Sequence, residues 1–276
     1  MHALKGIKVI SLAVNLPGPA MARRLHQLGA QVTKVEPPGG DPMSHYAPDW
    51  YSQLSEGQEI ITIDLKSETP GGRLDILLQD ADLLITASRP AALARLGLGW
   101  KDLHQKYPNL CHVAIVGYPP PLENEPGHDL TYQAKIGLLT PPFMPRTLIA
   151  DMTGAEKGTS EGLALLLAKE RGQAAGFTMV PLSEAADYMA EPFRAGVTAA
   201  GNILGGGIAE YNLYETNDGW LAVAALEPHF KKKMFEALNI TSENKNGLDE
   251  VFTEKSAAEW EKWAKALDLP IVAVKQ

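Results

Sequence analysis

A strand, a helix and a second strand follow one another at the start of the chain, and this order constrains the fold more than any other feature. Residues 7–12 form a short β-rich run, residues 20–28 carry apolar side chains at helical spacing, and residues 31–36 form a second β-rich run. Parallel strands need a helical crossover to join them. The first part of the chain is therefore predicted to be α/β with a parallel sheet.

The alternation of strands and helices continues to about residue 182. Further strands are expected at 60–65, 83–86, 111–116 and 176–182, and helices at 72–78, from 91, from 101, at 130–139, at 151–171 and at 183–190. The β-branched residues of 111–116 favour a buried, parallel position.

The second part of the chain has a different character. Residues 195–207 are rich in Gly and Ala and are interpreted as a linker. Residues 211–216 and 220–225, joined by Asn217-Asp218-Gly219, predict a β-hairpin. Helices at 228–238, 248–253 and 257–267 and a closing strand at 270–274 are expected to follow. We therefore predict a smaller α+β unit after the linker.

Composition excludes several classes of function. The 276 residues are 45% hydrophobic with a net charge of -8, which is typical of a globular protein and argues against a nucleic-acid partner. Cys111 is the single cysteine of the sequence, so neither an internal disulfide nor a Cys-based zinc site is expected. No segment approaches the eighteen apolar residues of a membrane span, and a cytoplasmic location is expected. No metal site is expected either.

Two familiar motifs do not hold in this sequence. The G-x-G-x-x-G fingerprint of dinucleotide binding is absent between residues 12 and 20, although Glu36 ends the second strand where an acidic residue could hold a ribose. Residues 158–162 match G-x-S-x-G, but no strand leads into Ser160 as a nucleophile elbow requires. We interpret these small residues as close helix packing.

His128 and Asp151 each stand where a helix is predicted to begin. Helix N-termini favour negative charge and often carry acid or base groups with altered pKa values. Asp151 and Asp129 are equally suited to N-cap roles, and His128 is expected one position before its cap. From residue types alone, capping and catalysis both remain open.

Ordered motifs from end to end carry a family resemblance. They are Leu4-Lys5-Gly6-Ile7-Lys8-Val9-Ile10, Pro17-Gly18-Pro19, Lys34-Val35-Glu36, Gly39-Gly40-Asp41-Pro42, Asp64-Leu65-Lys66, Arg89-Pro90, Arg95-Leu96-Gly97-Leu98-Gly99, Gly127-His128-Asp129-Leu130-Thr131-Tyr132, Ile149-Ala150-Asp151, Leu204-Gly205-Gly206 and Glu227-Pro228. In these motifs the chain resembles the class III CoA-transferases of the carnitine-dehydratase and bile-acid-inducible type, and most the α-methylacyl-CoA racemase branch.

The resemblance implies an architecture. It implies a large, Rossmann-like α/β domain built from both chain ends, with a small α+β domain inserted. Residues 1–182, completed by 256–276, would form the large CoA-binding domain, and residues 183–255 the linker and small domain. Two copies would form a homodimer of interlocked rings.

The resemblance also implies a ligand and a site. The ligand is a coenzyme A thioester bound as substrate, with no permanently bound cofactor. Asp151 and His128 match catalytic positions of the family, and Arg89 and Arg95 match CoA-binding arginines. Further CoA-binding positions are expected at Gly127, Asp129 and Tyr132.

Three functions follow from these positions. The first is racemisation or epimerisation of a 2-methylacyl-CoA by His128 and Asp151. The second is transfer of CoA to a free carboxylic acid through an acyl anhydride at Asp151. The third is a non-catalytic partner subunit, favoured by Pro37 and Gln58-Glu59, which stand where relatives carry basic residues that help hold CoA phosphates.

Overall fold

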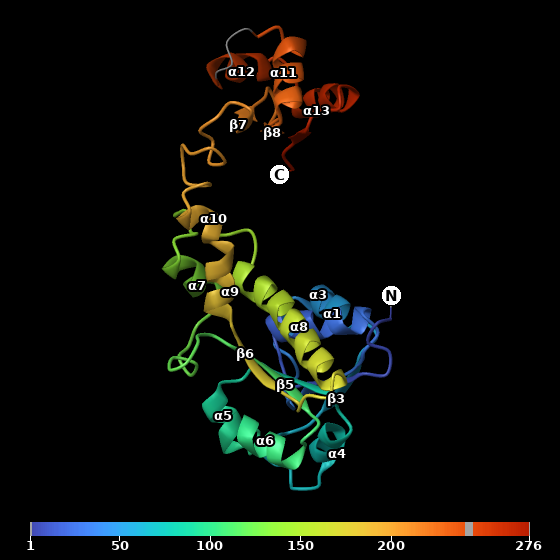
Figure 1. Cartoon of the computed structure of the whole chain (residues 1–276). Coiled ribbons are helices and arrows are strands. Elements are labelled where there is room, and N and C mark those ends of the chain that lie inside the picture. Colours follow the sequence, from blue (N-terminus) through green and yellow to red (C-terminus); the bar gives the residue numbers. More distant parts are fainter. Residues whose placement is uncertain (1, 241–244, 276) are drawn as a thin grey trace. The chain divides into compact units, whose positions relative to one another are not determined.

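The computed structural model describes residues 2–240 and 245–275, which divide into two compact units. The first unit ends at Ala190 and the second begins at Glu191. The expected boundary at residue 182 is too early, because helix α9 (Leu182–Met189) packs along helix α8 (Ile149–Glu170) within the first unit (Figure 1).

A parallel sheet forms the centre of the first unit. Its strands are β1 (Lys8–Ser11), β2 (Gln31–Glu36), β3 (Glu59–Thr62), β4 (Leu83–Thr86), β5 (Cys111–Val116) and β6 (Phe177–Pro181). In the described part of the chain they lie in the order β3-β2-β1-β4-β5-β6, and each neighbouring pair is parallel. This is the strand order of the Rossmann fold, and the predicted parallel α/β class is confirmed.

Helices cover both faces of this sheet because its strands are apolar on both sides. In β4, Leu83 and Ile85 belong to one core cluster and Leu84 to another. Besides α8 and α9, the helices of the unit are α1 (Pro17–Gln27), α2 (Met43–Tyr46), α3 (Pro48–Ser55), α4 (Arg73–Gln79), α5 (Pro90–Arg95), α6 (Trp100–Lys106) and α7 (Asp129–Lys135). The first cluster includes side chains of α1 and α8, and the second includes side chains of α4, α5 and α6.

A buried cation stabilises the loops that follow β1 and β2. The Lys34 side chain is 1% exposed, and its Nζ lies 2.7 Å from Glu36 Oε1 and 2.6 Å from Asp41 Oδ2. Asp41 Oδ1 accepts the backbone N–H groups of Asn15 and Met43. The Glu36 carboxylate is therefore engaged in a structural cluster, which it joins through Lys34 and the Asp41 N–H, rather than exposed for a ribose.

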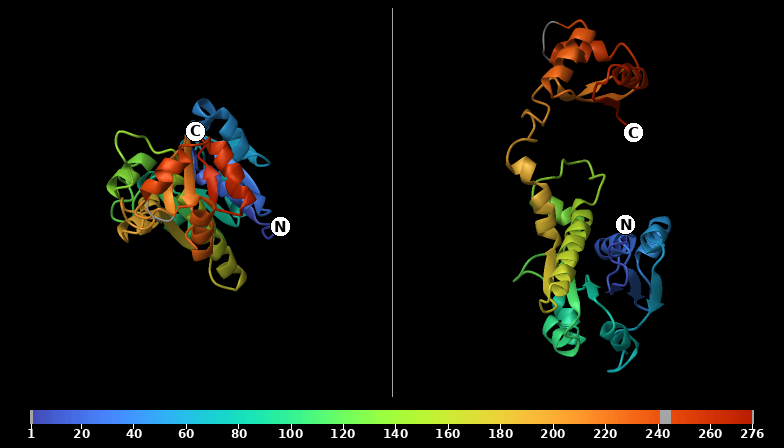
Figure 2. Two further views of the ribbon diagram at one scale, coloured as in Figure 1. Left: turned by 90° about the horizontal axis from the view of Figure 1, so that it is seen from above. Right: turned by 45° about the vertical axis from the view of Figure 1, so that its right-hand side comes forward.

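The second unit contains an antiparallel sheet and helices of its own. Strands β7 (Tyr211–Glu215), β8 (Trp220–Ala224) and β9 (Ile271–Ala273) lie in that order. The helices are α10 (Glu191–Arg194), α11 (Pro228–Ala237), α12 (Lys245–Phe252) and α13 (Ala257–Ala266). The predicted hairpin at 211–225 is confirmed, and the right-hand view of Figure 2 shows the helices of this unit beside its short strands.

The expected return of the chain end to the large sheet is wrong. Strand β9 pairs antiparallel with β8, and Ile271 lies in the same core as Trp260 of α13. Residues 256–275 therefore belong to the second unit. The cause is that the hairpin leaves an open edge on β8, and the apolar side chains of residues 257–271 cover the core beneath it.

Replacing Lys34 by Met should destabilise the first unit strongly. The change leaves two buried carboxylates facing each other without their cation, which should cost about 3–5 kcal/mol of unfolding free energy. Lys8→Met is the matched control, because Lys8 forms an exposed ion pair with Asp80 that should contribute at most about 1 kcal/mol. Urea unfolding followed by circular dichroism measures both changes, and equal losses would show that the Lys34 cluster contributes no more than a surface ion pair.

Candidate active site

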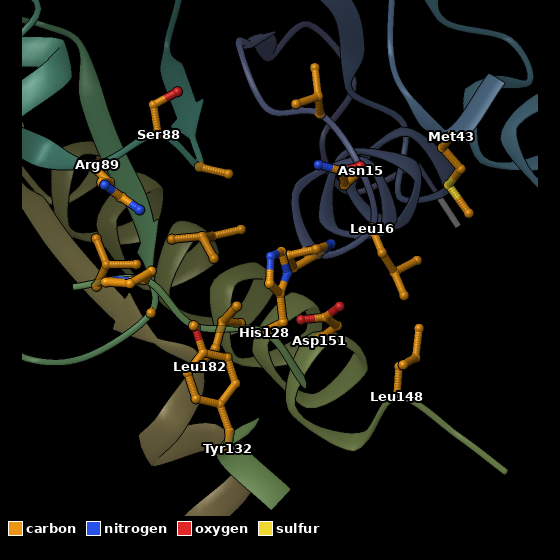
Figure 3. Close-up of a pocket in the computed structure, with 18 of the residues that line it drawn as sticks. Asn15, Leu16, Met43, Ser88, Arg89, His128, Tyr132, Leu148, Asp151 and Leu182 are labelled. Carbon is orange, nitrogen blue, oxygen red and sulfur yellow. The ribbon is translucent and has the colours of Figure 1, made fainter. Parts of the chain in front are cut away.

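A pocket of about 540 Å³ opens where the strand order reverses, between β1 and β4. In parallel sheets the loops on either side of such a point separate and leave a crevice at the carboxyl ends of the strands. The pocket is lined by residues 14–17 after β1, residues 87–89 after β4, and residues 115–117 at the end of β5. Further lining residues are Glu123, residues 125–128, Tyr132, Leu148, Asp151 and Leu182. Figure 3 shows His128, Tyr132, Leu148, Asp151 and Leu182 among them.

Asp151 is a carboxyl group of this pocket with a strongly altered pKa. It stands in the first turn of α8, and its backbone N–H donates to Asp129 Oδ1 at 3.1 Å. Burial, followed by the nearby charge of Asp129, raises the pKa of Asp151 to about 7. The predicted N-cap role is wrong because α8 begins earlier, with Leu148 at the N-cap. A carboxyl group that is half-protonated near neutral pH can act as an acid, a base or a nucleophile.

His128 lies in the same pocket as Asp151, as the sequence predicted. It is itself the N-cap of α7, so the expectation that Asp129 caps this helix is wrong by one position. Its N–H donates to Thr131 Oγ1 at 3.1 Å, which fixes the backbone where the imidazole leaves the helix. Figure 3 shows the imidazole and the Asp151 carboxylate, which come from different helices, in the same part of the pocket.

The neighbours of His128 have structural contacts of their own. Asp129 is 4% exposed and does not line the pocket; its carboxylate accepts the Asp151 N–H and the Gln133 amide. Gly127 makes room for the buried Tyr132 ring, since a Cβ at Gly127 would lie 2.5 Å from that ring. Tyr132 lines the pocket, and burial raises its pKa to about 12. This geometry therefore does not favour a direct role of the Asp129 side chain in CoA binding.

The two predicted CoA arginines differ in their surroundings. Arg89 is the N-cap of α5 and lines the pocket, and Figure 3 shows it beside Ser88. Arg95 is exposed at the last turn of α5, its Nε donates to Ala91 O at 3.2 Å, and it is not part of the pocket wall. Arg89 is thus the basic side chain that the pocket offers to an anion.

Met43, Tyr46 and Trp50 form an apolar wall that sequence reasoning missed. They lie on α2 and α3, in a segment for which the sequence patterns predicted neither a helix nor a strand. The signal was present, because Met43, Tyr46, Trp50 and Leu54 recur at spacings of three and four residues.

The residues that favoured loss of CoA binding stand outside the pocket. Neither Pro37 nor Gln58 nor Glu59 lines it. Glu59 begins β3 at the amino edge of the sheet, where its Oε2 accepts the Thr33 hydroxyl. The departures at these positions therefore do not affect any residue that lines the pocket.

Residues 2–240 and 245–275 carry neither a metal cluster nor a membrane span. Within these ranges, no group of three or more His, Cys, Asp or Glu side chains could hold a metal ion. In the same part of the chain, no helix combines the length and the apolarity that a membrane span requires.

Comparison with known proteins identifies the family. The model of CoA-transferase family III matches residues 4–276. The chain belongs to this family. It is 29% identical over 289 residues to the α-methylacyl-CoA racemase of Homo sapiens, a match covering 94% of this chain and 74% of the racemase. It is also 37% identical over 143 residues to the cinnamoyl-CoA:phenyllactate CoA-transferase of Clostridium sporogenes, covering 47% of this chain and 35% of the transferase.

A solved structure supports the fold of this family III chain. A hypothetical protein from Mycobacterium tuberculosis matches with a TM-score of 0.87 at 24% identity, covering 99% of this chain and 85% of the other. The protein is an enzyme of CoA-transferase family III, whose relatives are named both as racemases and as CoA-transferases.

Asp151→Asn should stabilise the fold at pH 8 and have little effect near pH 4. Because the pKa of Asp151 is raised in the folded protein, ionising it costs folding free energy, and that cost appears as pH rises from about 4 to above 7. The amide never ionises, so we expect a gain of about 1–3 kcal/mol at pH 8. Urea unfolding at both pH values measures this gain. Asp49→Asn is the control, because Asp49 is exposed on α3. A gain independent of pH would contradict ionisation of Asp151 as its origin.

Proposed function

We propose that the protein moves a proton at the α-carbon of an acyl-CoA thioester, as a racemase or epimerase of 2-methylacyl-CoA substrates. The observation that carries the proposal is the pairing of Asp151, whose pKa is about 7, with His128 in one pocket. Inverting a carbon centre requires a group that removes the proton and another that returns it to the opposite face. The family model and the match to a named racemase support this choice.

The pocket offers different surroundings at different places for such a substrate. Met43, Tyr46 and Trp50 provide apolar surface suited to an acyl chain. Arg89 provides a cation suited to the phosphates of CoA, because charge-assisted contacts with phosphate are strong. The thioester would then lie between these regions, where His128 and Asp151 are found.

In the proposed mechanism one of the two groups removes the α-proton to give an enolate, and the other then donates a proton to the opposite face of the α-carbon. The thioester oxygen gains negative charge as the enolate forms, and a hydrogen-bond donor of the pocket close to that oxygen would stabilise it. Return of a proton from the group on the opposite face gives the inverted product. The raised pKa of Asp151 allows it to serve in both directions near neutral pH.

CoA transfer is the second candidate, favoured by the match to a named CoA-transferase over 143 residues. Here an Asp151 carboxylate oxygen would attack the thioester carbonyl, the C–S bond would break, and CoA would leave as the thiolate with an acyl anhydride at Asp151. A free carboxylic acid would accept the CoA in the second half of the reaction. This chemistry does not require His128 as a base.

Deuterium exchange distinguishes the candidates. A 2-methylacyl-CoA incubated in deuterated water should gain deuterium at its α-carbon, and His128→Ala and Asp151→Asn should each slow the gain by about 100-fold or more. Mass spectrometry of the recovered thioester measures the exchange, with His2→Ala as an exposed control.

A transferase would give a different result in the same experiment. It would exchange CoA between two acids, form an adduct at Asp151 that hydroxylamine traps, and keep part of its activity in His128→Ala. Absence of both activities across a panel of acyl-CoA thioesters would contradict both candidate reactions.

Arg89→Ala should weaken CoA binding by at least about tenfold, as expected for a lost phosphate contact. Arg95→Ala is the matched control, because Arg95 lies on the same helix but outside the pocket wall, and it should change affinity less. Isothermal titration calorimetry with CoA measures both dissociation constants. Equal losses, or no loss for Arg89→Ala, would put the phosphate contacts elsewhere.

A further inference from the structure

Gln133 is a fully buried polar residue that contributes nothing to the pocket wall. Its side chain is 1% exposed on α7, one helical turn after Asp129. Residues four positions apart lie on the same face of a helix, so the two side chains are neighbours. A buried amide in such a place needs polar partners, because an unpaired one costs folding free energy.

The Gln133 amide connects α7 to the residues at the start of α8. Its Nε2 donates to Asp129 Oδ2 at 2.5 Å and to the backbone oxygen of Thr147 at 3.2 Å. The other carboxylate oxygen of Asp129 accepts the N–H of Asp151 at 3.1 Å. The contacts therefore form a chain from Gln133 through Asp129 to Asp151, and a second tie from Gln133 to the residue that precedes the N-cap of α8.

These contacts decide where a buried negative charge resides. Asp129 is 4% exposed, so its carboxylate depends on hydrogen-bond donors in place of water. Without the Gln133 amide, Oδ2 would lose its donor. The carboxylate would then no longer be held in place, and turning towards solvent would move its negative charge away from Asp151.

We propose that Gln133 is a positioning residue for the reaction: by donating to Asp129 and Thr147 together, it holds the Asp129 carboxylate against the first turn of α8 and so keeps a proton available on Asp151. The proposal rests on the proposed function only for its catalytic meaning. The charge effect itself is a property of the folded protein.

Other ionisable groups also face Asp151. His128 and Arg89 line the same pocket, and Tyr46 and Tyr132 interact electrostatically with the Asp151 carboxylate. A shift on changing Gln133 must therefore be separated from a general disturbance of the pocket.

The test is a pH titration of the Asp151 carboxyl by carbon NMR in protein labelled at Asp, with Asp151→Asn used to assign the signal. Asp129→Asn removes the neighbouring charge and should lower the Asp151 midpoint by about 1 pH unit. Gln133→Leu should also lower the Asp151 midpoint. Thr159→Val is the matched control, since it removes a buried hydroxyl on α8 that donates to Ala155 O, and it should leave the midpoint unchanged.

A double variant shows whether Gln133 acts through Asp129. If it does, adding Gln133→Leu to Asp129→Asn should produce no further change in the Asp151 midpoint. An unchanged or raised Asp151 midpoint in Gln133→Leu would overturn the proposal. The proposal would also be overturned if Gln133→Leu lowered the midpoint as much in the Asp129→Asn background as it does alone.

Activity gives an independent readout. In Gln133→Leu, kcat for α-proton exchange should fall about tenfold or more while KM for the thioester stays within about twofold, because the pocket wall is intact. If no substrate is turned over, the proposed function fails but the titration still decides the role of Gln133. A lowered Asp151 midpoint in Gln133→Leu together with an unchanged kcat would overturn the catalytic part of the proposal.

Discussion

The carboxyl edge of the parallel sheet is the constraint on which the site depends. Every strand of a parallel sheet ends at the same edge, so loops that are far apart in sequence meet there. The loop after β1, the loop after β4 and the end of β5 all line the pocket, and the order β3-β2-β1-β4-β5-β6 separates the first two at the point of reversal. His128 and Asp151 stand on helices packed at this edge, and the fold brings them together without any local sequence motif.

The site places the carboxyl groups of Asp129 and Asp151 close together, in an arrangement that differs from the Lys34 cluster. Around Lys34, each of the two nearby carboxylates contacts the buried cation. At Asp151 the neighbouring group is the like-charged Asp129, whose own donors are backbone and amide N–H groups. Like charges in a buried site favour the neutral form of one partner. The protein therefore gives up some folding stability at Asp151 to keep a protonatable group where substrate would lie, a common relation between stability and activity.

Much of the fold followed from local patterns, and the parts that did not follow have physical reasons. The alternation of β-rich and helical runs predicted the parallel sheet, and Asn217-Asp218-Gly219 predicted the hairpin of the second unit. The partner of the last strand could not be deduced, because residues 271–273 suit any open sheet edge; pairing with β8 is a tertiary choice set by the core around Trp260. The family resemblance misled at this point, since it implied a return to the large sheet.

Three of the expected site residues, His128, Asp151 and Arg89, line one pocket, and their roles in the reaction stay predictions. The separate fate of Arg95 follows from helix geometry, which places it more than one turn of α5 away from Arg89. The contacts of Asp129 with Gln133 and the Asp151 N–H join different helices, so spacing along the chain could not reveal them.

A crystal structure with a non-reactive ether analogue of a 2-methylacyl-CoA would test the proposed site most directly. We expect the analogue's α-carbon between His128 and Asp151, with the acyl chain against Met43 and Trp50 and phosphate near Arg89. An analogue bound with its α-carbon away from both His128 and Asp151, for example in the cleft lined by His26 and Lys8 at the amino edge of the sheet, would contradict this assignment.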